Sequence, residues 1–372
     1  NCSDCQNIWY SVDLNACTNC FGCSSLKNKS FHFFNEPLSE AEYNKQLQEF
    51  LSDPDRLHSL IQKRAKKVQA TRYVKHLNIM NCENVTGDVL RNCKNVHHTF
   101  YGFDDENVRH SWTVSNLKDT YDFNIGGYES ELCYELVSSG LKLFGCLFGM
   151  HHWGSCTQTV YCDFMLNNQN CFGCIGLRKA RNCFFNKAYS TQEYDDLCGR
   201  MVDHMIASGE WGEFFPHWIS GYGYNETLAH EHYLLSKQEV TGHWWNWHEE
   251  DEKVFSWDAY QTHPIHQYDE RSVDKQLASK NIAECLRSTF ACEQSGRPFR
   301  VVQKELAFYI ENSLPLPTLH PDERHRQRMS LRNPRKLWDR ECEMCWTSMS
   351  TSYAPDRSEK VLCEQCYRDV VY

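Results

Sequence analysis

The chain between residues 81 and 162 alternates short apolar groups with single turn-forming residues. Each group is introduced by Asn, Gly or a charged residue, as in Asn81-Cys82-Glu83-Asn84-Val85 and Asn92-Cys93-Lys94-Asn95-Val96. Such groups are too short and too frequent for helices, whereas a parallel β-helix needs short strands with a turn residue at each corner. Each coil buries one row of side chains and stacks on the next coil. We therefore predict a mainly β fold with a right-handed parallel β-helix-like solenoid, and a β-sandwich built from meanders is the alternative.

An internal duplication favours the solenoid. Shifting the chain by 151 positions aligns residues 5–43 with 156–194 without a gap, and 14 of the 39 aligned positions are identical. The shared core is Asn-Cys-Phe-Gly-Cys, at 19–23 and at 170–174. Self-similarity at a fixed offset is typical of repeat architectures. We expect 5–38 and 156–189 to follow the same path, with Cys20 and Cys171 pointing inward.

Both aligned segments end in a signal for the start of a helix. Ser39 stands three positions before Glu42, and Ser190 three positions before Glu193, which is the spacing of a capping box. Helical patterning follows in about 40–67 and 191–207. The sequence therefore predicts two helical excursions that leave the solenoid at Ser39 and Ser190.

Cysteine usage indicates a reducing compartment. The chain has 372 residues and 21 cysteines, an odd number, and several of them form CxxC pairs. Reduced thiols fit this pattern better than the disulfides of a small secreted domain. No apolar stretch approaches the roughly 18 residues of a membrane span, and no signal region stands at the N-terminus. We expect a cytoplasmic protein without a membrane partner. Because Asn1-Cys2 lies inside a cysteine motif and no Met precedes it, we also expect further residues before Asn1 in the native protein.

The C-terminal cysteines carry the strongest chemical signal. Cys342, Cys345, Cys363 and Cys366 form C-x2-C-x17-C-x2-C. This spacing is typical of a structural zinc ribbon, in which four thiolates fill a tetrahedral shell and leave no position open for catalysis. The sequence therefore predicts one structural Zn²⁺ at the end of the chain. Four reduced, partly buried thiols without a metal are the alternative.

A second cysteine set lies at the N-terminus. Cys2, Cys5, Cys17 and Cys20 also have zinc-like spacing. In the aligned second segment, however, Trp153 stands opposite Cys2 and Asn168 stands opposite Cys17. The loss of two ligand positions in one copy favours thiols of the core, and an N-terminal zinc site stays open as the alternative.

The segment from 209 to 268 lacks cysteine and contains six Trp and seven His, Trp257 among them. Exposed Trp faces suit sugar rings, nucleobases or cations. We favour the alternative, an aromatic segment that packs over the solenoid as a buckle. His230-x-His232 could supply two metal ligands, but no second His follows four residues after His230, so the HExxH helix of a zinc hydrolase is absent.

Residues 292–324 resemble the small bacterial zinc-binding domains of the form CxxCG-x-x-F…E-x-x-F-Y…LP…C-P-x-C-R. Cys292, Gly296 and Phe299 match this layout, and the pattern continues through 305–309 and Leu314-Pro315-Leu316-Pro317. Three ligand positions depart from it, because Ser295, His320 and Glu323 stand where the family has cysteine. The resemblance implies a module that keeps the fold without its metal, with Cys292 and His320 as the remaining potential ligands.

The whole chain resembles uncharacterised, cysteine-rich proteins of candidate-phylum bacteria that end in such a ribbon. The resemblance extends through Tyr222-Gly223-Tyr224-Asn225-Glu226-Thr227 and the Phe-Gly-Cys motifs. This family implies no activity. Together these patterns predict four units: a solenoid over 1–208, a Trp- and His-rich connecting segment over 209–284, a degenerate zinc-binding module over 285–330 and a zinc ribbon over 331–372.

One basic strip stands out in an otherwise acidic chain with a formal net charge of −10. A net negative charge argues against general coating of nucleic acid, so any such contact must be local. A basic strip beside a zinc ribbon suits RNA phosphates and unstacked bases, whereas the alternative is a solvated helix face that pairs with acidic residues. The strip consists of Arg324, Arg326, Arg328, Arg332, Arg335, Lys336 and Arg340.

Three function classes follow. We favour a non-enzymatic scaffold that docks to RNA or a ribonucleoprotein through the basic strip, with a protein–protein adaptor as the alternative. The third class is a β-helix enzyme acting on carbohydrate through two carboxylates, but no spacing selects a pair. The available carboxylates are Asp104, Asp105, Asp119, Asp122 and Asp163.

Overall fold

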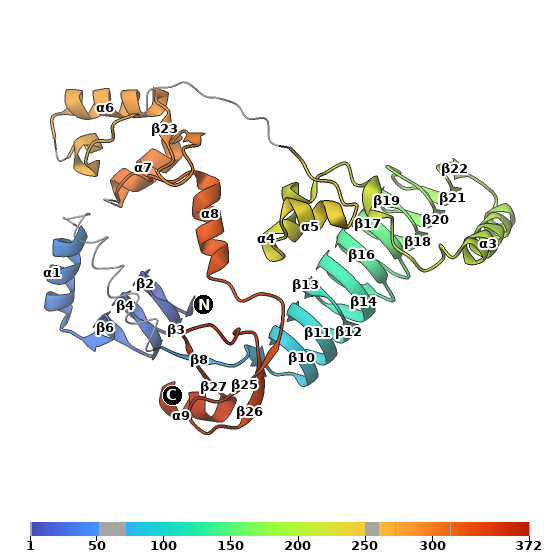
Figure 1. Cartoon of the computed structure of the whole chain (residues 1–372), viewed down its shortest axis with the longest axis horizontal. Coiled ribbons are helices and arrows are strands. Elements are labelled where there is room, and N and C mark those ends of the chain that lie inside the picture. Colours follow the sequence, from blue (N-terminus) through green and yellow to red (C-terminus); the bar gives the residue numbers. More distant parts are fainter. Residues whose placement is uncertain (1, 52–71, 250–259, 272, 313, 372) are drawn as a thin grey trace.

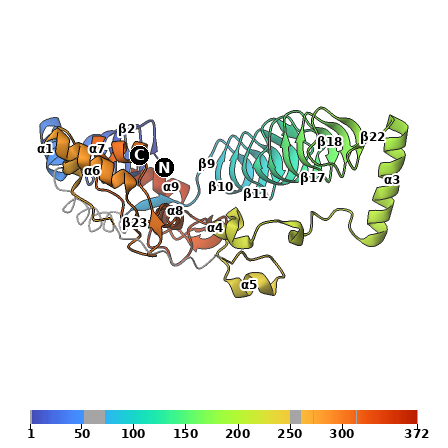
Figure 2. The same cartoon turned by 90° about the horizontal axis from the view of Figure 1, so that it is seen from above.

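The structure is a computed structural model that describes residues 2–51, 72–249, 260–271, 273–312 and 314–371. Most strands belong to two stacks of coils, one in residues 2–37 and one in residues 79–188 (Figure 1). Seen from above, the second stack is a long coiled solenoid (Figure 2). Strands of successive coils pair in parallel, which excludes the meander-built sandwich. The predicted mainly β solenoid is confirmed.

The first stack consists of two parallel sheets, β1-β3-β5 and β2-β4-β6 with β7 added antiparallel. Its strands are β1 (Cys2–Ser3), β2 (Gln6–Trp9), β3 (Val12–Asn15), β4 (Thr18–Phe21), β5 (Ser24–Lys27), β6 (Ser30–Phe33) and β7 (Glu36–Pro37), and helix α1 (Glu40–Leu51) follows.

The second stack is a 14-stranded sheet system. Its strands are β9 (Ile79–Met80), β10 (Glu83–Arg91), β11 (Lys94–Phe103), β12 (Glu106–Arg109), β13 (Trp112–Ser115), β14 (Leu117–Gly126), β15 (Ser130–Glu131), β16 (Tyr134–Ser139), β17 (Leu147–Trp153), β18 (Thr157–Val160), β19 (Asp163–Leu166), β20 (Gln169–Phe172), β21 (Arg181–Phe184) and β22 (Lys187–Ala188). Helix α3 (Thr191–Ser208) follows it.

The coils have a three-residue period that the sequence prediction missed. Asn92, Asn95, His98 and Tyr101 all have φ between 51° and 59°, in the left-handed region. Short polar residues such as Asn adopt this conformation more readily than most others. The next residue in each case is buried: Cys93, Val96 and Thr99 are at most 2% exposed, and Gly102 is buried as well. Gln6 pairs with Thr18, and Thr18 with Ser30, so one coil of this stack has 12 residues and hence four sides of three residues.

The inward cysteines act as hydrogen-bonding groups as well as apolar ones. The backbone N–H of Cys174 donates to Cys162 Sγ (3.4 Å). The Cys174 thiol in turn donates to the carbonyl oxygen of Cys183 (3.4 Å). Ser111 Oγ accepts in the same way from the N–H of Phe123, one coil later (3.1 Å). Burying a backbone N–H without an acceptor is costly. The interior therefore selects small side chains that accept, and Cys, Ser, Thr and Asn share these positions.

The two aligned segments share most of their elements, although strand β5 corresponds only to isolated bridges at Ile175 and Arg178. Under the 151-position shift β4 matches β20, β6 matches β21, β7 matches β22, and α1 and α3 begin at equivalent residues. Cys20 and Cys171 both point inward and are fully buried, as predicted. Each stack thus ends in an antiparallel strand and a capped helix, so the shared sequence marks the closing cap of a stack. That the two segments arose by duplication stays a prediction.

Both helices begin where the capping boxes predict. The N–H of Glu193 donates to Ser190 Oγ and the N–H of Ser190 donates to the Glu193 carboxylate, and Ser39 and Glu42 do the same. Helix α3 ends at Ser208, close to the prediction. Helix α1 is described up to Leu51, and the remainder of the predicted helix over 40–67 lies outside the described residues.

The Trp- and His-rich segment packs in part over the solenoid. Tyr161 donates its hydroxyl to the carbonyl oxygen of Glu213 (3.0 Å), and its ring meets Trp211 edge-on at 6.0 Å. Trp245 stacks on Tyr224 within the segment, whereas Trp218 and Trp244 are 67% and 86% exposed. Trp257 lies outside the described residues. The segment forms η1 (His217–Ile219), η2 (Tyr224–Glu226), α4 (Leu228–His232), α5 (Lys237–Gly242) and η3 (Ile265–Tyr268).

The C-terminal elements form two small hairpin-and-helix modules. The first has its own core, which includes Tyr268, Cys285, Phe290 and Leu306. The short helix predicted around 305–309 is α7. The elements are α6 (Lys275–Arg287), β23 (Phe290–Ala291), β24 (Pro298–Phe299), α7 (Gln303–Glu311) and α8 (Pro321–Ser330), followed by β25 (Trp338–Glu341), β26 (Ser348–Thr351), β27 (Lys360–Leu362) and α9 (Glu364–Val371).

The last module joins the two stacks. Strand β27 pairs in parallel with β8 (Tyr73–Lys75), in the connection between the stacks. Thr351 Oγ1 donates to the carbonyl oxygen of His76 (2.7 Å), and Ser352 hydrogen-bonds to the buried Asp88 of the second stack. On the other side, Ser25 Oγ of the first stack donates to the carbonyl oxygen of Tyr73 (3.1 Å). The ribbon is therefore integrated into the fold. Within the described residues, no helix is long and apolar enough to cross a membrane.

Candidate metal centre and adjoining groove

The four cysteines predicted as ligands come together. The sulfur atoms of Cys342, Cys345, Cys363 and Cys366 all lie within 4.8 Å of one another. Cys342 and Cys345 stand in the turn after β25, and Cys363 and Cys366 stand where β27 passes into α9. Four thiols at this separation can enclose one tetrahedral metal ion. The structure therefore contains a closed four-cysteine group that could hold a metal.

The turn around Cys342 prepares its sulfur for a negative charge. The N–H of Cys363 donates to Cys342 Sγ (3.3 Å), and Trp346, at φ 62°, directs its N–H to the Cys342 carbonyl oxygen (3.0 Å). Burial raises the pKa of Cys342, but hydrogen bonds from the backbone of Cys345 and Cys363 outweigh it and lower that pKa overall. Hydrogen bonds with Thr347 lower the pKa of Cys345 to about 6. Since metals bind thiolates, this environment favours ligation.

The degenerate module repeats this turn without a complete ligand set. Gly296, at φ 66°, donates its N–H to the Cys292 carbonyl oxygen (2.8 Å), as Trp346 does to Cys342. Burial raises the pKa of Cys292, but hydrogen bonds from the backbone of His320 and Ser295 lower it overall. The turn at Cys292 thus offers a thiolate the same backbone hydrogen bonds as the turn at Cys342, whereas Ser295, His320 and Glu323 are the other residues that the sequence comparison placed at ligand positions.

The remaining positions of this module serve other contacts. His320 Nδ1 accepts from the N–H of Asp322 (3.1 Å) and caps α8. The Glu323 carboxylate is buried and pairs with Arg326 at 2.5 Å. Among the described residues, the ribbon cysteines are the only group of three or more metal-ligating side chains gathered closely enough to hold an ion. Neither the N-terminal cysteines nor His230 and His232 belong to such a group.

The basic strip is divided between internal and exposed residues. Three of its seven cations form ion pairs within the chain, which reduces their availability to a ligand. These pairs are Arg324 with Glu305 (3.0 Å), Arg326 with Glu323 (2.5 Å) and Arg340 with Glu343 (3.2 Å).

Arg335 anchors the strip to the solenoid. Its guanidinium lies 3.3 Å from the centre of the Trp112 ring, and its Nη2 lies 3.0 Å from His232 Nε2. Burial lowers the pKa of Arg335 to about 10. A cation over an indole face is a favourable contact. Arg332 lies more loosely over Tyr101 at 5.3 Å and stays exposed, as do Arg328 and Lys336.

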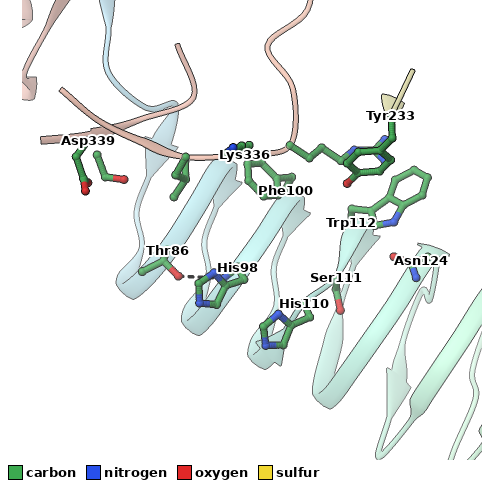
Figure 3. Close-up of a pocket in the computed structure, with 13 residues that line it drawn as sticks. Thr86, His98, Phe100, His110, Ser111, Trp112, Asn124, Tyr233, Lys336 and Asp339 are labelled. Atoms are coloured by element: carbon green, nitrogen blue, oxygen red, sulfur yellow. Dashed lines mark hydrogen bonds between the residues drawn. The ribbon is translucent and has the colours of Figure 1, made fainter. Parts of the chain in front are cut away.

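A groove of about 700 Å³ runs between this strip and the second stack. Its floor is formed by one side of the coils that contain strands β10, β11 and β13, and its roof is formed by residues 335–339 (Figure 3). The imidazoles of His98 and His110 stack on the floor with centroids 5.0 Å apart and planes 2° from parallel. The groove thus combines aromatic rings with the cations Arg335 and Lys336.

Sequence reasoning identified none of the groove residues except Arg335 and Lys336. His98 and His110 are 12 positions apart, so the coil period stacks them, and that period was the missing signal. The contact between Trp112 and Arg335 joins positions too distant in the chain for any local pattern to reveal.

Four of the five carboxylates considered for a hydrolase have structural partners. Asp104 accepts from Asn92 and Asp119 accepts from Asn107, in polar ladders along the coil corners. Asp105 is 1% exposed in the interior, and Asp163 contacts His151 Nδ1 at 2.9 Å. The groove contains a single carboxylate, Asp339, among its lining residues. The described lining of the groove therefore supplies no pair of acid and base carboxylates.

The chain matches no known protein-family model, no curated protein and no solved structure at a significant level.

Proposed function

We propose that this protein is a non-enzymatic scaffold, stabilised by one zinc ion, that docks to RNA or a ribonucleoprotein through the basic strip. The observation that carries the proposal is the exposure of Arg328, Arg332 and Lys336 in the segment that leads to the four-cysteine group, with Lys336 lining the groove. Small rigid platforms with cations and aromatic rings suit the phosphates and unstacked bases of RNA. None of the 21 cysteines is paired in a disulfide, which is consistent with a cytoplasmic location.

The proposed contact is modest in size. Since three of the strip's cations are paired internally and Arg335 lies over Trp112, three remain for phosphates. Each phosphate contact on a single strand contributes about −0.7 to the slope of log affinity against log salt. We therefore expect a slope of about −2, which is weak enough to be consistent with the net charge of −10.

Charge reversal of Arg328, Arg332 and Lys336 to Glu tests the proposal. Arg335 is left unchanged because its reversal would place a carboxylate against Trp112. A matched control reverses Lys94, Lys118 and Lys142, which carry the same charge on the solenoid. RNA association measured by filter binding should fall in the first variant and persist in the control, with zinc content equal in both. Unchanged RNA association in the first variant would refute the proposal.

A protein–protein adaptor is the second candidate, favoured by a separate apolar surface on neighbouring coils of the second stack. Its side chains are between 43% and 54% exposed, and exposed apolar clusters mark interaction sites. An adaptor would keep its partner in high salt and after nuclease treatment, and it would lose the partner when Leu141 and Phe144 are changed to Lys. The surface consists of Tyr128, Leu132, Leu141, Phe144 and Trp153.

A further inference from the structure

We infer that the groove between the second stack and the basic strip binds an unpaired nucleotide of single-stranded RNA, with the base stacked at the end of the His98–His110 pair. This inference rests on the proposed RNA-docking function and names the ligand of the groove. Two observations carry it: an unfinished aromatic stack and the cations at the roof.

The aromatic stack ends within the groove. The His98 and His110 rings are parallel and one coil apart, but the preceding coil presents Thr86 and Gly87, which have no ring. Thr86, His98 and His110 all line the groove, and Figure 3 shows them in a row along one corner of the floor. A planar base placed over Thr86 would continue the stack. Stacking of this kind tolerates every base, because each has a π-face.

The roof of the groove supplies cations. Arg335 lines the groove, with its guanidinium over the Trp112 ring. Phosphate oxygens are favourable partners for such cations. Lys336 adds an exposed ammonium at the roof, which suits the phosphate attached to the stacked base.

Shape selects a single strand over a duplex. The stack lies inside a groove, and a base in an A-form helix cannot leave its neighbours to enter it. A duplex can still contact the exposed cations of the strip through its phosphates. The groove therefore adds a preference for unpaired RNA to an electrostatic contact that has no such preference.

The test uses the full, zinc-loaded chain and the double variant His98→Asn, His110→Asn. Asn suits both positions, because Asn95 and Asn107 adopt the same left-handed conformation on the neighbouring corner. The probes are oligoadenylate of about ten nucleotides, a site size typical of single-strand binders, an RNA duplex, and adenosine monophosphate alone. The double variant should bind the oligoadenylate about tenfold more weakly, equivalent to about 1.4 kcal/mol. Its duplex binding and salt slope should equal those of the parent.

Other results separate this inference from the proposed function. If the double variant binds the oligoadenylate like the parent while the Arg328, Arg332 and Lys336 reversal weakens it, the groove inference is wrong and the docking proposal stands. If the reversal has no effect, both are wrong. If adenosine monophosphate binds as tightly as the oligoadenylate, the groove belongs to a free nucleotide and not to RNA. In the parent, the ring-proton NMR signals of His98 and His110 should shift on adding the oligoadenylate, and unchanged signals would overturn the inference.

Discussion

The substitution Asp105→Asn should stabilise the protein above neutral pH and leave it unchanged in acid. Asp105 points into the second stack and is 1% exposed. One carboxylate oxygen accepts from the N–H of Leu117 (2.9 Å), and the other has no partner among the described residues. Burial raises the pKa of Asp105 from 3.8 to about 7. The interior therefore favours the protonated carboxyl, and ionising it costs folding free energy.

The magnitude follows from the pKa difference. A difference of about three units corresponds to about 4 kcal/mol, at 1.36 kcal/mol for each unit. Since the folded-state pKa lies above the unfolded value, the contribution of Asp105 to stability is fully present below about pH 4 and is lost as pH rises to about 7. The variant cannot ionise at this position. Its stability advantage should therefore grow from near zero at pH 4 to at most about 4 kcal/mol above pH 7.

An existing residue shows that Asn fits such a position. Asn168 occupies the corresponding inward site five coils on, where its Oδ1 accepts from the N–H of Ala180 (2.8 Å) and its Nδ2 donates to the carbonyl oxygen of Leu177 (2.8 Å). The equivalent acceptor for Asn at 105 is the carbonyl oxygen of Val114. We expect the substituted side chain to make both bonds.

Urea unfolding of the parent and the variant, followed by circular dichroism from pH 4 to 8, measures the difference. Burial lowers the pKa of His152 to about 4, so the contribution of His152 to stability is present above pH 6.5 and is lost on acidification. This contribution is the same in both proteins, so it cancels when the unfolding free energy of the parent is subtracted from that of the variant. Asp104→Asn is the matched control, because it removes the same charge from an exposed corner. Parallel stability curves for parent and Asp105→Asn would refute the reasoning.

Three further outcomes follow from other contacts. Elemental analysis should find about one zinc per chain. Cys363→Ser should remove this zinc and reduce the hydrogen-exchange protection of β8, because metal binding and folding are coupled at such sites. Zinc retained by the variant would contradict the four-cysteine site. Gly173→Ala should destabilise the closing cap by about 1–3 kcal/mol in thermal unfolding. The φ angle of Gly173 is +61°, and a Cβ at this position would lie 2.6 Å from the Phe185 ring. An unchanged midpoint of thermal unfolding would contradict this prediction. Arg335→Met should lower the unfolding free energy by about 1–2 kcal/mol through loss of the contact with Trp112, and an effect equal to that of Arg328→Met would show that the contact is unimportant.

The solenoid could be predicted because the residues that form its corners recur along the sequence. Asn before a small or apolar residue recurs at the turns, and Asn is one of the few residues that enter the left-handed region readily. The three-residue period was missed because the inward positions are occupied by Cys, Val, Thr, Asp and Leu alike. The spacing between cysteines is therefore irregular and does not show the period. Following Asn, Asp and Gly in steps of three would have revealed it.

The four-cysteine group was predictable and the groove was not, for the same physical reason. CxxC spacing fixes two ligands on one local turn, so sequence alone brings half of the site together. The groove depends on the packing of Arg335 against Trp112 and of Ser352 against Asp88, between segments that only the folded chain brings together. The internal pairing of Arg324, Arg326 and Arg340 was likewise invisible in a strip read as seven equivalent cations.

The position of the four-cysteine group links these two halves of the molecule. Its hairpin β25–β26 begins within the groove roof and leads to Thr351 and Ser352, which are bonded to His76 and Asp88 near the start of the second stack. A metal that clamps this hairpin to β27 would fix the roof relative to the floor formed by His98 and His110. The four-cysteine group is therefore placed where a bound metal would hold the roof of the groove in position, although none of the four cysteines lines the groove.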